Sequence, residues 1–298
     1  MPDPNEVSPP MPRRLDSGLY IVSTPIGSAR DITLRALDTL AGVDLIAAED
    51  TRTARKLMEI HGSALNGRPV LPYHDYNGDE MRPKLLAALG EDRTLAYVSD
   101  AGTPMVADPG FALARAAIEA GHAVFSVPGA SAALAALTVS GLPTDRFFFA
   151  GFAPQAAGKL RTFLSDLAQV EATLVVYEAP RRLKRFLDVS VDILGPGRNA
   201  AICRELTKKF EDIQRGSLSE LAARADELVL KGECVVVIDR STDTLVPDDT
   251  EIARALTTLL ARLSFKDAVQ AVSEDLKLPR RAVYQIGLTL PKPENRKE

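Results

Sequence analysis

Short apolar runs alternate with stretches of helical spacing through the first half of this 298-residue chain, and this alternation restricts its fold more than any other feature. Each run has the length of a strand and is apolar throughout, which is typical of strands covered on both faces. The runs are LYIVS (19–23), VDLIAA (43–48), LAYVS (95–99) and AVFSV (123–127). Between them, residues 31–42 gather apolar side chains on one helical face, and residues 110–120 begin after Pro109 and end before Gly121, as a helix does. Strand and helix in alternation predict a parallel sheet.

A second set of apolar runs follows an interruption at 128–145 that is rich in glycine and proline. These runs are RFFFAG (146–151), TLVVYE (173–178), AAICRE (200–205) and ECVVVID (233–239). The segment KKFEDIQRG (208–216) follows AAICRE after too few residues for a crossover helix, so we expect these two to pair antiparallel. The second sheet is therefore predicted to be mixed, with a domain boundary near 130–145.

The end of the chain reads as a polar linker, STDTLVPDD (241–249), followed by three short helical patterns. Within them one apolar spacing occurs twice, at Ala268, Val269, Val272 and Leu276 and again at Ala282, Val283, Ile286 and Leu290, with a break at Leu278-Pro279. Two short amphipathic helices joined by a tight turn resemble a helix-turn-helix. The alternative is a helical cap on the second domain.

These patterns predict two α/β domains, the first with a parallel sheet and the second with a mixed sheet, and a small helical domain after them. The predicted limits are a disordered tail at 1–16, an N-terminal α/β domain at 17–135, a C-terminal α/β domain at 136–242 and a helical extension at 243–298. The tail is set apart because it holds five prolines and cannot bury apolar surface or sustain a helix.

Composition excludes several classes of protein. With 36 Lys and Arg against 40 Asp and Glu, the formal charge is −4, so we expect no general coating of DNA, and any nucleic-acid partner needs a local basic patch. The two cysteines, Cys203 and Cys234, have neither metal-site nor disulfide spacing, which favours a reducing cytoplasm. The three histidines are scattered, so no metal is assigned. The chain has neither an apolar stretch of membrane-spanning length nor the pattern of a signal peptide, and we expect no membrane association.

Four loops lie at the predicted carboxyl ends of the first-domain strands, where open parallel sheets bind ligands. They are STPIG (23–27), AAEDTRT (47–53), VSDAGTPMVADPG (98–110) and VPGASAA (127–133). Asp100 is the strongest single candidate, because it ends an apolar strand inside a loop restricted by glycine and proline. Gly27 would let backbone approach a ligand closely, although a simple strand-to-helix turn explains STPIG equally well. Helix capping by Asp50 or Thr51 is an equal alternative to a functional acid pair in the second loop.

None of these loops is a nucleotide fingerprint, since both GxxxxGK[ST] and GxGxxG are missing. Taken together and in order, however, several motifs resemble the bacterial ribosomal RNA small subunit methyltransferase I family. They are LYIVSTPIG, DLIAAEDTR, VSDAGTP with DPG, PGASA, GLPTDRF, APRRL and CRELTK, and the resemblance runs from about Gly18 to about Leu290. That family belongs to the tetrapyrrole-methylase superfamily, and its helix-turn-helix-like extension corresponds to 250–290. One departure is Ser28-Ala29, where the family usually has Asn-Leu.

The resemblance implies that S-adenosyl-L-methionine binds between the two α/β domains. Its expected first-domain contacts are Pro25, Asp100, the turn Ala101, Gly102, Thr103 and Pro104, and Ala130 with Ser131. Its expected second-domain contacts are Tyr177, Leu206 and Glu233. A carboxylate such as Asp100 can accept hydrogen bonds from a ribose or an amine, which suits that cofactor.

The reaction implied is methylation of a cytidine 2′-hydroxyl in 16S rRNA, which needs a base for the hydroxyl proton. We assign that role to Glu49 or Asp50, with Arg52 and Lys208 positioning phosphate. Glu178 and Glu205 also end predicted strands, but salt bridges to Arg181 or Arg204 explain them equally well.

Phosphate contacts require local positive charge. Cations cluster at 181–185, at 204–215 and in the helix-turn-helix pattern, and the expected RNA contacts are Arg181, Arg182, Lys208, Arg280 and Arg281. A solvated helix face is the alternative for any one cluster.

The partners that the resemblance implies are 16S rRNA in the 30S subunit and a second copy of the chain. Two other functions stay open: a methyltransferase for a small tetrapyrrole-like substrate, and an inactive ribosome-associated RNA-binding protein.

Overall fold

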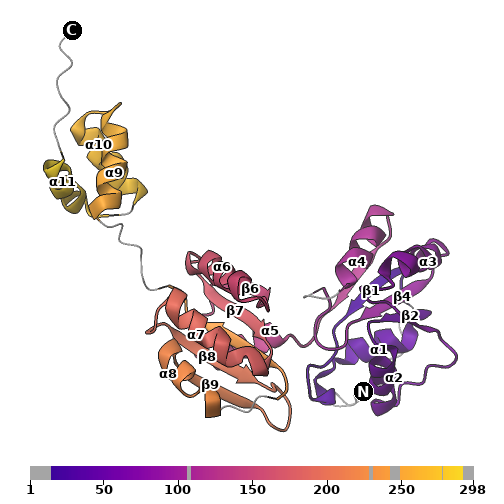
Figure 1. Ribbon diagram of the computed structural model, residues 1–298. Helices are drawn as coiled ribbons and strands as arrows, with labels where there is room; N and C mark the ends of the chain where they lie inside the picture. Colours follow the sequence, from indigo (N-terminus) through magenta and orange to yellow (C-terminus); the bar gives the residue numbers. More distant parts are fainter. Residues whose placement is uncertain (1–14, 106–108, 228–230, 242–248, 277, 291–298) are drawn as a thin grey trace, which may run out of the picture. The chain divides into compact units, whose positions relative to one another are not determined.

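The computed structural model describes residues 15–105, 109–227, 231–241, 249–276 and 278–290 (Figure 1). The chain divides into two compact units, Met1–Arg240 and Ser241–Glu298. Most of the predicted tail, residues 1–14, lies outside the described residues, as does Asp108 of the DPG motif. The last two tail residues contact the first sheet's domain, since the side chain of Leu15 packs beside Gly42 and the Tyr20 hydroxyl donates to the Asp16 carbonyl.

The first sheet has five strands in the order β3-β2-β4-β1-β5, and all its pairs are parallel, as predicted. The strands are β1 (Gly18–Val22), β2 (Leu45–Ala48), β3 (Val70–Pro72), β4 (Thr94–Val98) and β5 (Val124–Val127). The four predicted runs are confirmed as β1, β2, β4 and β5. We call this sheet and its helices, residues 15–127, the first lobe.

Helices cover both faces of this sheet, which is why its strands are apolar throughout (Figure 1). The helices are α1 (Leu34–Gly42), α2 (Thr51–Ile60), α3 (Gly78–Gly90) and α4 (Gly110–Glu119), with a short 3₁₀ turn at Ala29–Asp31. One face packs against α3 and α4 through side chains such as Leu89 and Leu113, and the other packs against α1 and α2 through Leu40 and Met58. Because all five strands run the same way, their carboxyl ends share one edge, where all four candidate loops lie.

The second sheet is mixed, in the order β6-β7-β10-β8-β9. Its strands are β6 (Phe147–Phe152), β7 (Thr173–Glu178), β8 (Asn199–Arg204), β9 (Asp212–Ser217) and β10 (Cys234–Ile238). The predicted antiparallel pairing of AAICRE with the segment after it is confirmed by β8 and β9, and β6 is parallel to β7. The two remaining pairs, β7 with β10 and β10 with β8, are antiparallel.

Four helices pack on this second sheet: α5 (Ala132–Ser140), α6 (Ala157–Ala168), α7 (Leu183–Leu194) and α8 (Leu218–Ala223). Helices α6, α7 and α8 share one core with one face, whereas α5 packs on the other face beside β8 and β10. We call residues 132–240 the second lobe because α5 belongs to this sheet by its contacts. The predicted limits of the α/β domains stay predictions.

The C-terminal unit is a three-helix bundle of α9 (Asp249–Leu260), α10 (Phe265–Asp275) and α11 (Arg280–Thr289), which confirms the three helical patterns. Val269, Val272 and Val283 are buried in its core, as the repeated spacing requires. Ala282, which the spacing also placed on the buried face, is exposed, and Gly287 takes an inner position against the Phe265 ring. Lys277, one of the cations in the helix-turn-helix pattern, lies outside the described residues. Within the described part of the chain, no helix combines the length and the apolarity that crossing a membrane requires.

Candidate functional site

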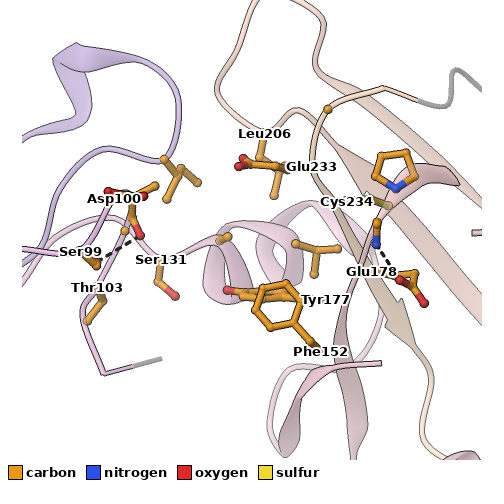
Figure 2. A pocket seen from close by; sticks show the side chains of 18 of the residues that line it. Ser99, Asp100, Thr103, Ser131, Phe152, Tyr177, Glu178, Leu206, Glu233 and Cys234 are labelled. Atoms are coloured by element: carbon orange, nitrogen blue, oxygen red, sulfur yellow. Dashed lines mark hydrogen bonds between the residues drawn. The ribbon is translucent and has the colours of Figure 1, made fainter. Parts of the chain in front are cut away.

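A cavity of about 410 Å³ lies between the first and second lobes (Figure 2). Its first-lobe wall comes from the loops that follow β1, β2 and β4, and it continues onto the start of α5. Its second-lobe wall comes from the ends of β6 and β7, the turn after β8 and the start of β10. In Figure 2, Ser99, Asp100, Thr103 and Ser131 face Tyr177, Leu206 and Glu233 across this space.

Hydrogen bonds tie the first-lobe loops into one surface. Thr24 and Gly102 exchange two backbone hydrogen bonds, of 2.9 and 3.1 Å, which join the loops after β1 and β4. The Thr103 hydroxyl accepts from Ser23 Oγ at 3.1 Å and donates to the Ala130 carbonyl at 2.9 Å, which adds the loop after β5. The loops after β1, β4 and β5 are therefore held together by hydrogen bonds.

Two acids at the ends of β2 and β4 hold each other's loop. The backbone N–H of Asp100 donates to Glu49 Oε2 at 3.2 Å. Partial burial and the charge of Asp50 raise the pKa of Asp100, while a backbone hydrogen bond from Asp50 and the charge of Arg52 oppose that rise. Glu49 and Asp100 both line the cavity, so this pair brings carboxylate oxygens to its first-lobe wall.

Asp50 acts as the N-cap of α2, so the capping considered for Asp50 or Thr51 is made by Asp50. Its carboxylate accepts from the Arg52 backbone N–H at 2.8 Å and from the Arg52 guanidinium at 2.6 Å. These bonds lower the pKa of Asp50 to about 2. An acid so well satisfied is a poor proton acceptor.

An aromatic pair forms part of the second-lobe wall. The rings of Phe152 and Tyr177 meet edge to face with centroids 5.2 Å apart. Burial raises the pKa of Tyr177, against a backbone hydrogen bond from Ala133 at the start of α5. Phe152 keeps 59% of its surface exposed, so an apolar ligand face has an aromatic surface to cover.

Glu178 is a buried carboxylate at the end of β7, and its charge is matched locally. Its Oε1 accepts from the Ala179 N–H and from Arg182 Nε, both at 2.7 Å, and the Arg182 guanidinium forms a 2.6 Å ion pair with it. The alternative of a salt bridge is thus correct for Glu178, but the partner is Arg182 rather than Arg181. Similarly, Glu205 pairs with Lys208 rather than with Arg204.

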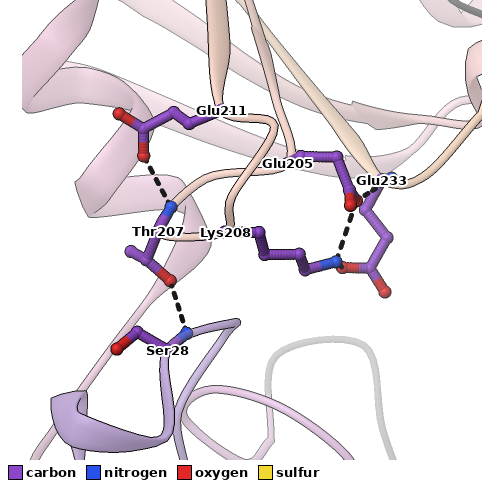
Figure 3. Close-up of polar contacts among 6 residues, drawn as sticks. All are labelled: Ser28, Glu205, Thr207, Lys208, Glu211 and Glu233. Atoms are coloured by element: carbon purple, nitrogen blue, oxygen red, sulfur yellow. Dashed lines mark hydrogen bonds and ion pairs between the residues drawn. The ribbon is translucent and has the colours of Figure 1, made fainter.

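The turn after β8 carries strained backbone. Glu205 and Thr207 both lie in the left-handed region, at φ 51° and 62°. For a β-branched residue such as Thr207 this conformation is rare. Thr207 Oγ1 nevertheless accepts from the Ser28 N–H of the first lobe at 3.0 Å, so the strained turn reaches across to the other lobe (Figure 3).

Lys208 follows in the same turn and binds two carboxylates at once (Figure 3). Its Nζ lies 2.8 Å from Glu205 Oε1 and 3.0 Å from Glu233 Oε2. Burial alone would lower the pKa of Lys208, but the hydrogen bonds to the two glutamates outweigh it and the pKa is raised. The hydrogen bond with Lys208 lowers the pKa of Glu205. Glu205, Lys208 and Glu233 therefore form one hydrogen-bonded cluster next to Thr207.

Known proteins match both the α/β part and the helical part of this chain. The family model of the tetrapyrrole (corrin/porphyrin) methylases matches residues 18–222, and the model of the RsmI C-terminal HTH domain matches residues 246–291. A ribosomal RNA small subunit methyltransferase I from Mesorhizobium japonicum is 46% identical over 284 residues, covering 93% of this chain and 94% of that protein. The chain belongs to the ribosomal RNA small subunit methyltransferase I family. The resemblance read from its motifs is thereby confirmed.

Two further comparisons agree with this family. The Halalkalibacterium halodurans protein of the same name is 40% identical, with 92% of this chain and 96% of that protein covered. Among solved structures, a uroporphyrin-III C-methyltransferase from Thermus thermophilus, in complex with S-adenosyl homocysteine, has a TM-score of 0.51 at 21% identity. It covers 74% of this chain and 97% of its own, and this likeness establishes the fold.

Most of the expected cofactor contacts meet in the first cavity. Asp100, Ala101, Gly102, Thr103, Ser131, Tyr177, Leu206 and Glu233 all line it. The other three expected contacts, Pro25, Pro104 and Ala130, are not among the described residues that line this cavity. Pro25 lines a neighbouring cavity, and Ala130 holds Thr103 in place through its carbonyl.

The expected catalytic and RNA contacts are more dispersed. Glu49 lines the first cavity, whereas Asp50 and Arg52 form the ion pair at the start of α2. Arg182 lines the cavity wall as the partner of Glu178, and Arg181 is exposed beside it. Arg280 and Arg281 are exposed in the first turn of α11.

Gly27 lies in close contact with the second lobe. A Cβ atom on Gly27 would lie 2.5 Å from Lys208 Cγ and 2.6 Å from Thr207 Oγ1. The glycine therefore permits the second lobe to approach closely, and it also lines the neighbouring cavity.

Several residues that line the first cavity were not predicted from the sequence. Phe152 ends β6, whose parallel pairing with β7 brings its end to the edge that Tyr177 occupies. Gly232, Cys234 and Val235 lie at or just before the start of β10, and antiparallel pairing sets Cys234 opposite Glu178. The signal for Phe152 was its place at a strand end, whereas Gly232, Cys234 and Val235 could be placed only from the order of strands in the second sheet.

Proposed function

We propose that this protein is an S-adenosylmethionine-dependent methyltransferase that acts on RNA of the small ribosomal subunit. The observation that carries the proposal is that one cavity between the lobes is lined by Asp100, Ser131, Tyr177, Leu206 and Glu233 together. Membership of the family supplies the substrate class, since its relatives are named for small-subunit ribosomal RNA. The finer assignment is the 2′-hydroxyl of a cytidine in 16S rRNA of the 30S subunit.

The residues present fit the cofactor. A volume of about 410 Å³ falls within the range of about 300–1,000 Å³ that small-molecule sites occupy. Asp100 offers carboxylate oxygens to a ribose or an amine, and the Phe152–Tyr177 pair offers an apolar surface. Ser131 is the N-cap of α5 and lines the cavity together with Ala132, so the positive end of this helix adjoins the cavity.

When bound, S-adenosylmethionine supplies a methyl group on a sulfonium, whose transfer forms an O–C bond, breaks an S–C bond and leaves S-adenosylhomocysteine. The chain's own task is to align the acceptor, and alignment can supply up to about 7–11 kcal/mol of the barrier. The acceptor hydroxyl must also lose its proton. We assign this step to Glu49, which lines the cavity, rather than to Asp50, whose pKa is lowered to about 2 by Arg52.

RNA contacts are proposed at Arg181, Lys208, Arg280 and Arg281. In a helix-turn-helix the first residues of the second helix reach the nucleic acid, and Arg280 and Arg281 hold that place in α11. A cytoplasmic location and a homodimer belong to the same proposal. Exposed Phe147 and Phe148 on the edge strand β6 offer apolar surface for a second copy.

The test is transfer of radiolabelled methyl groups to unmethylated 30S subunits and to free 16S rRNA, with the product mapped to one nucleotide. We expect a single labelled cytidine, with the label on the ribose. Glu49→Gln should abolish transfer while calorimetry still detects cofactor binding, and Arg280→Glu/Arg281→Glu should weaken RNA binding alone. Label only in a small tetrapyrrole would favour that substrate class, and cofactor binding without transfer would favour an inactive RNA-binding protein.

A further inference from the structure

A second cavity, of about 300 Å³, adjoins the first. Its walls come from the loop after β1, from α2 and from Lys208. Both cavities are lined by Ile26, Ser99, Asp100, Ala101 and Glu233, so they share one wall. A ligand in the second cavity would meet a ligand of the first at Asp100.

The lining of this second cavity combines aliphatic and cationic groups. Pro25, Leu57 and Ile60 supply aliphatic surface, and 55% of the surface of Ile60 is exposed. Lys56 and Lys208 supply ammonium groups. A flat base covers aliphatic surface and a phosphate pairs with an ammonium group, so a nucleotide satisfies both parts of the lining at once.

The two lysines differ in what they already bind. Lys208 is held by Glu205 and Glu233, as Figure 3 shows. Lys56 is exposed and forms no ion pair with any residue that the structure describes. It also lies one helical turn after Arg52, so α2 presents two cations on the same side. Lys56 is therefore the cation available to an incoming phosphate.

We propose that the second cavity binds the nucleotide that accepts the methyl group, with its base on the aliphatic wall and its phosphate on Lys56. The proposal rests on the proposed function, because it needs an RNA acceptor. RNA bases that are recognised individually are splayed out of their stack, and an exposed cavity of this size receives one such nucleotide. The shared wall then brings the acceptor ribose beside the donor at Asp100.

The first experiment compares Lys56→Ala with Arg55→Ala in the full-length protein. Arg55 is the matched control because it is the exposed neighbour on the same helix and lines neither cavity. Methyl transfer to unmethylated 30S subunits is measured at several salt concentrations, and cofactor affinity is measured by calorimetry. For Lys56→Ala we expect the KM for RNA to rise about tenfold and the salt slope to fall by about 1, with cofactor Kd unchanged. Equal KM values for Lys56→Ala and the wild type, or equal rises for both variants, would overturn the assignment.

The second experiment fills the cavity with Thr53→Trp, since Thr53 is exposed on α2 and lines this cavity alone. We expect the cofactor Kd to be kept and methyl transfer to be lost. Transfer at the wild-type rate would show that the acceptor binds elsewhere. Failure of the proposed function has a different signature, because the wild-type protein would then leave 30S RNA unlabelled, and the acceptor assignment would fall with it.

Discussion

Replacing Gly27 by alanine tests how tightly the two lobes are joined. An added Cβ would lie 2.5 Å from Lys208 Cγ, 2.6 Å from Thr207 Oγ1 and 2.9 Å from the Leu206 carbonyl oxygen. The lysine stem can swing aside, but the carbonyl belongs to the backbone and the hydroxyl is bonded to Ser28. The loop after β1 and the turn after β8 must therefore move apart.

The cost follows from these contacts. Forcing one methyl group into a closed contact costs about 1–3 kcal/mol. Loss of the 3.0 Å hydrogen bond between the Ser28 N–H and Thr207 Oγ1 adds about 0.5–1.5 kcal/mol. Alanine returns about 0.4–1 kcal/mol by restricting the unfolded chain. The net expectation is a fall of about 0.5–4 kcal/mol in the free energy of unfolding.

Affinity should fall as well, because the residues on either side of the contact, Ile26 and Leu206, both line the first cavity. We expect the Kd for S-adenosylmethionine to rise about tenfold, or about 1.4 kcal/mol. Denaturant unfolding and calorimetry measure the two effects. The control is Gly158→Ala in α6, where an added Cβ meets no atom within 4 Å and helix propensity gains up to about 1 kcal/mol. If Gly27→Ala kept the wild-type stability and Kd, the inference of a closed contact between the lobes would be refuted.

Three further predictions concern single side chains. Thr207→Gly removes backbone strain of about 1–2 kcal/mol at φ 62°, but it also removes the hydrogen-bond acceptor for the Ser28 N–H. We therefore expect a free energy of unfolding within about 1 kcal/mol of wild type and a raised cofactor Kd. A larger loss of stability in denaturant unfolding would contradict the strain. Glu178→Gln leaves Arg182 without its buried counter-charge, so denaturant unfolding should show a loss of about 3 kcal/mol. The control Glu80→Gln removes a solvent-exposed pair and should lose much less, and equal losses would refute the contrast. Burial raises the pKa of both Cys203 and Cys234 to about 12, so at pH 8 roughly one thiol in 10⁴ is ionised. Iodoacetamide should therefore label the protein only after unfolding, and labelling of the folded protein would contradict this prediction.

Periodicity was sufficient to predict the first lobe's main strands but not all of its elements. β3 is only three residues long, ends in Pro72 and lies at the sheet edge, so it carries little alternation or apolar length. α3 contains Pro83, which removes a backbone donor and argues locally against a helix. Both elements depend on packing against neighbours that a local pattern does not include.

Some residues of the candidate site could likewise be predicted from local sequence patterns, and others could not. Residues at the ends of parallel strands, such as Asp100 and Ser131, were predictable because the ends of such strands share an edge. The contact of Gly27 with Thr207 joins residues 180 positions apart, and no local pattern encodes it. Family resemblance supplied Tyr177, Leu206 and Glu233, whose place in the cavity depends on how the second sheet pairs.

The strained turn after β8 explains why this site tolerates unfavourable backbone. Three successive side chains there serve three surfaces: Leu206 lines the first cavity, Thr207 binds Ser28 of the first lobe, and Lys208 lines the second cavity. An extended strand offers only two alternating faces, so a left-handed residue on each side of Leu206 re-aims the chain. Each such residue costs about 1–3 kcal/mol.

Local hydrogen bonds hold this conformation in place. The Glu205 N–H donates to the Glu233 carbonyl at 3.0 Å, and the Thr207 N–H donates to Glu211 Oε2 at 2.6 Å. The Glu205 carboxylate adds the Lys208 ammonium and the Glu233 N–H. Because so many bonds converge on one turn, relaxing either left-handed residue would move the side chains that line the two cavities and break the contact with the other lobe. These hydrogen bonds therefore offset the strain of the turn.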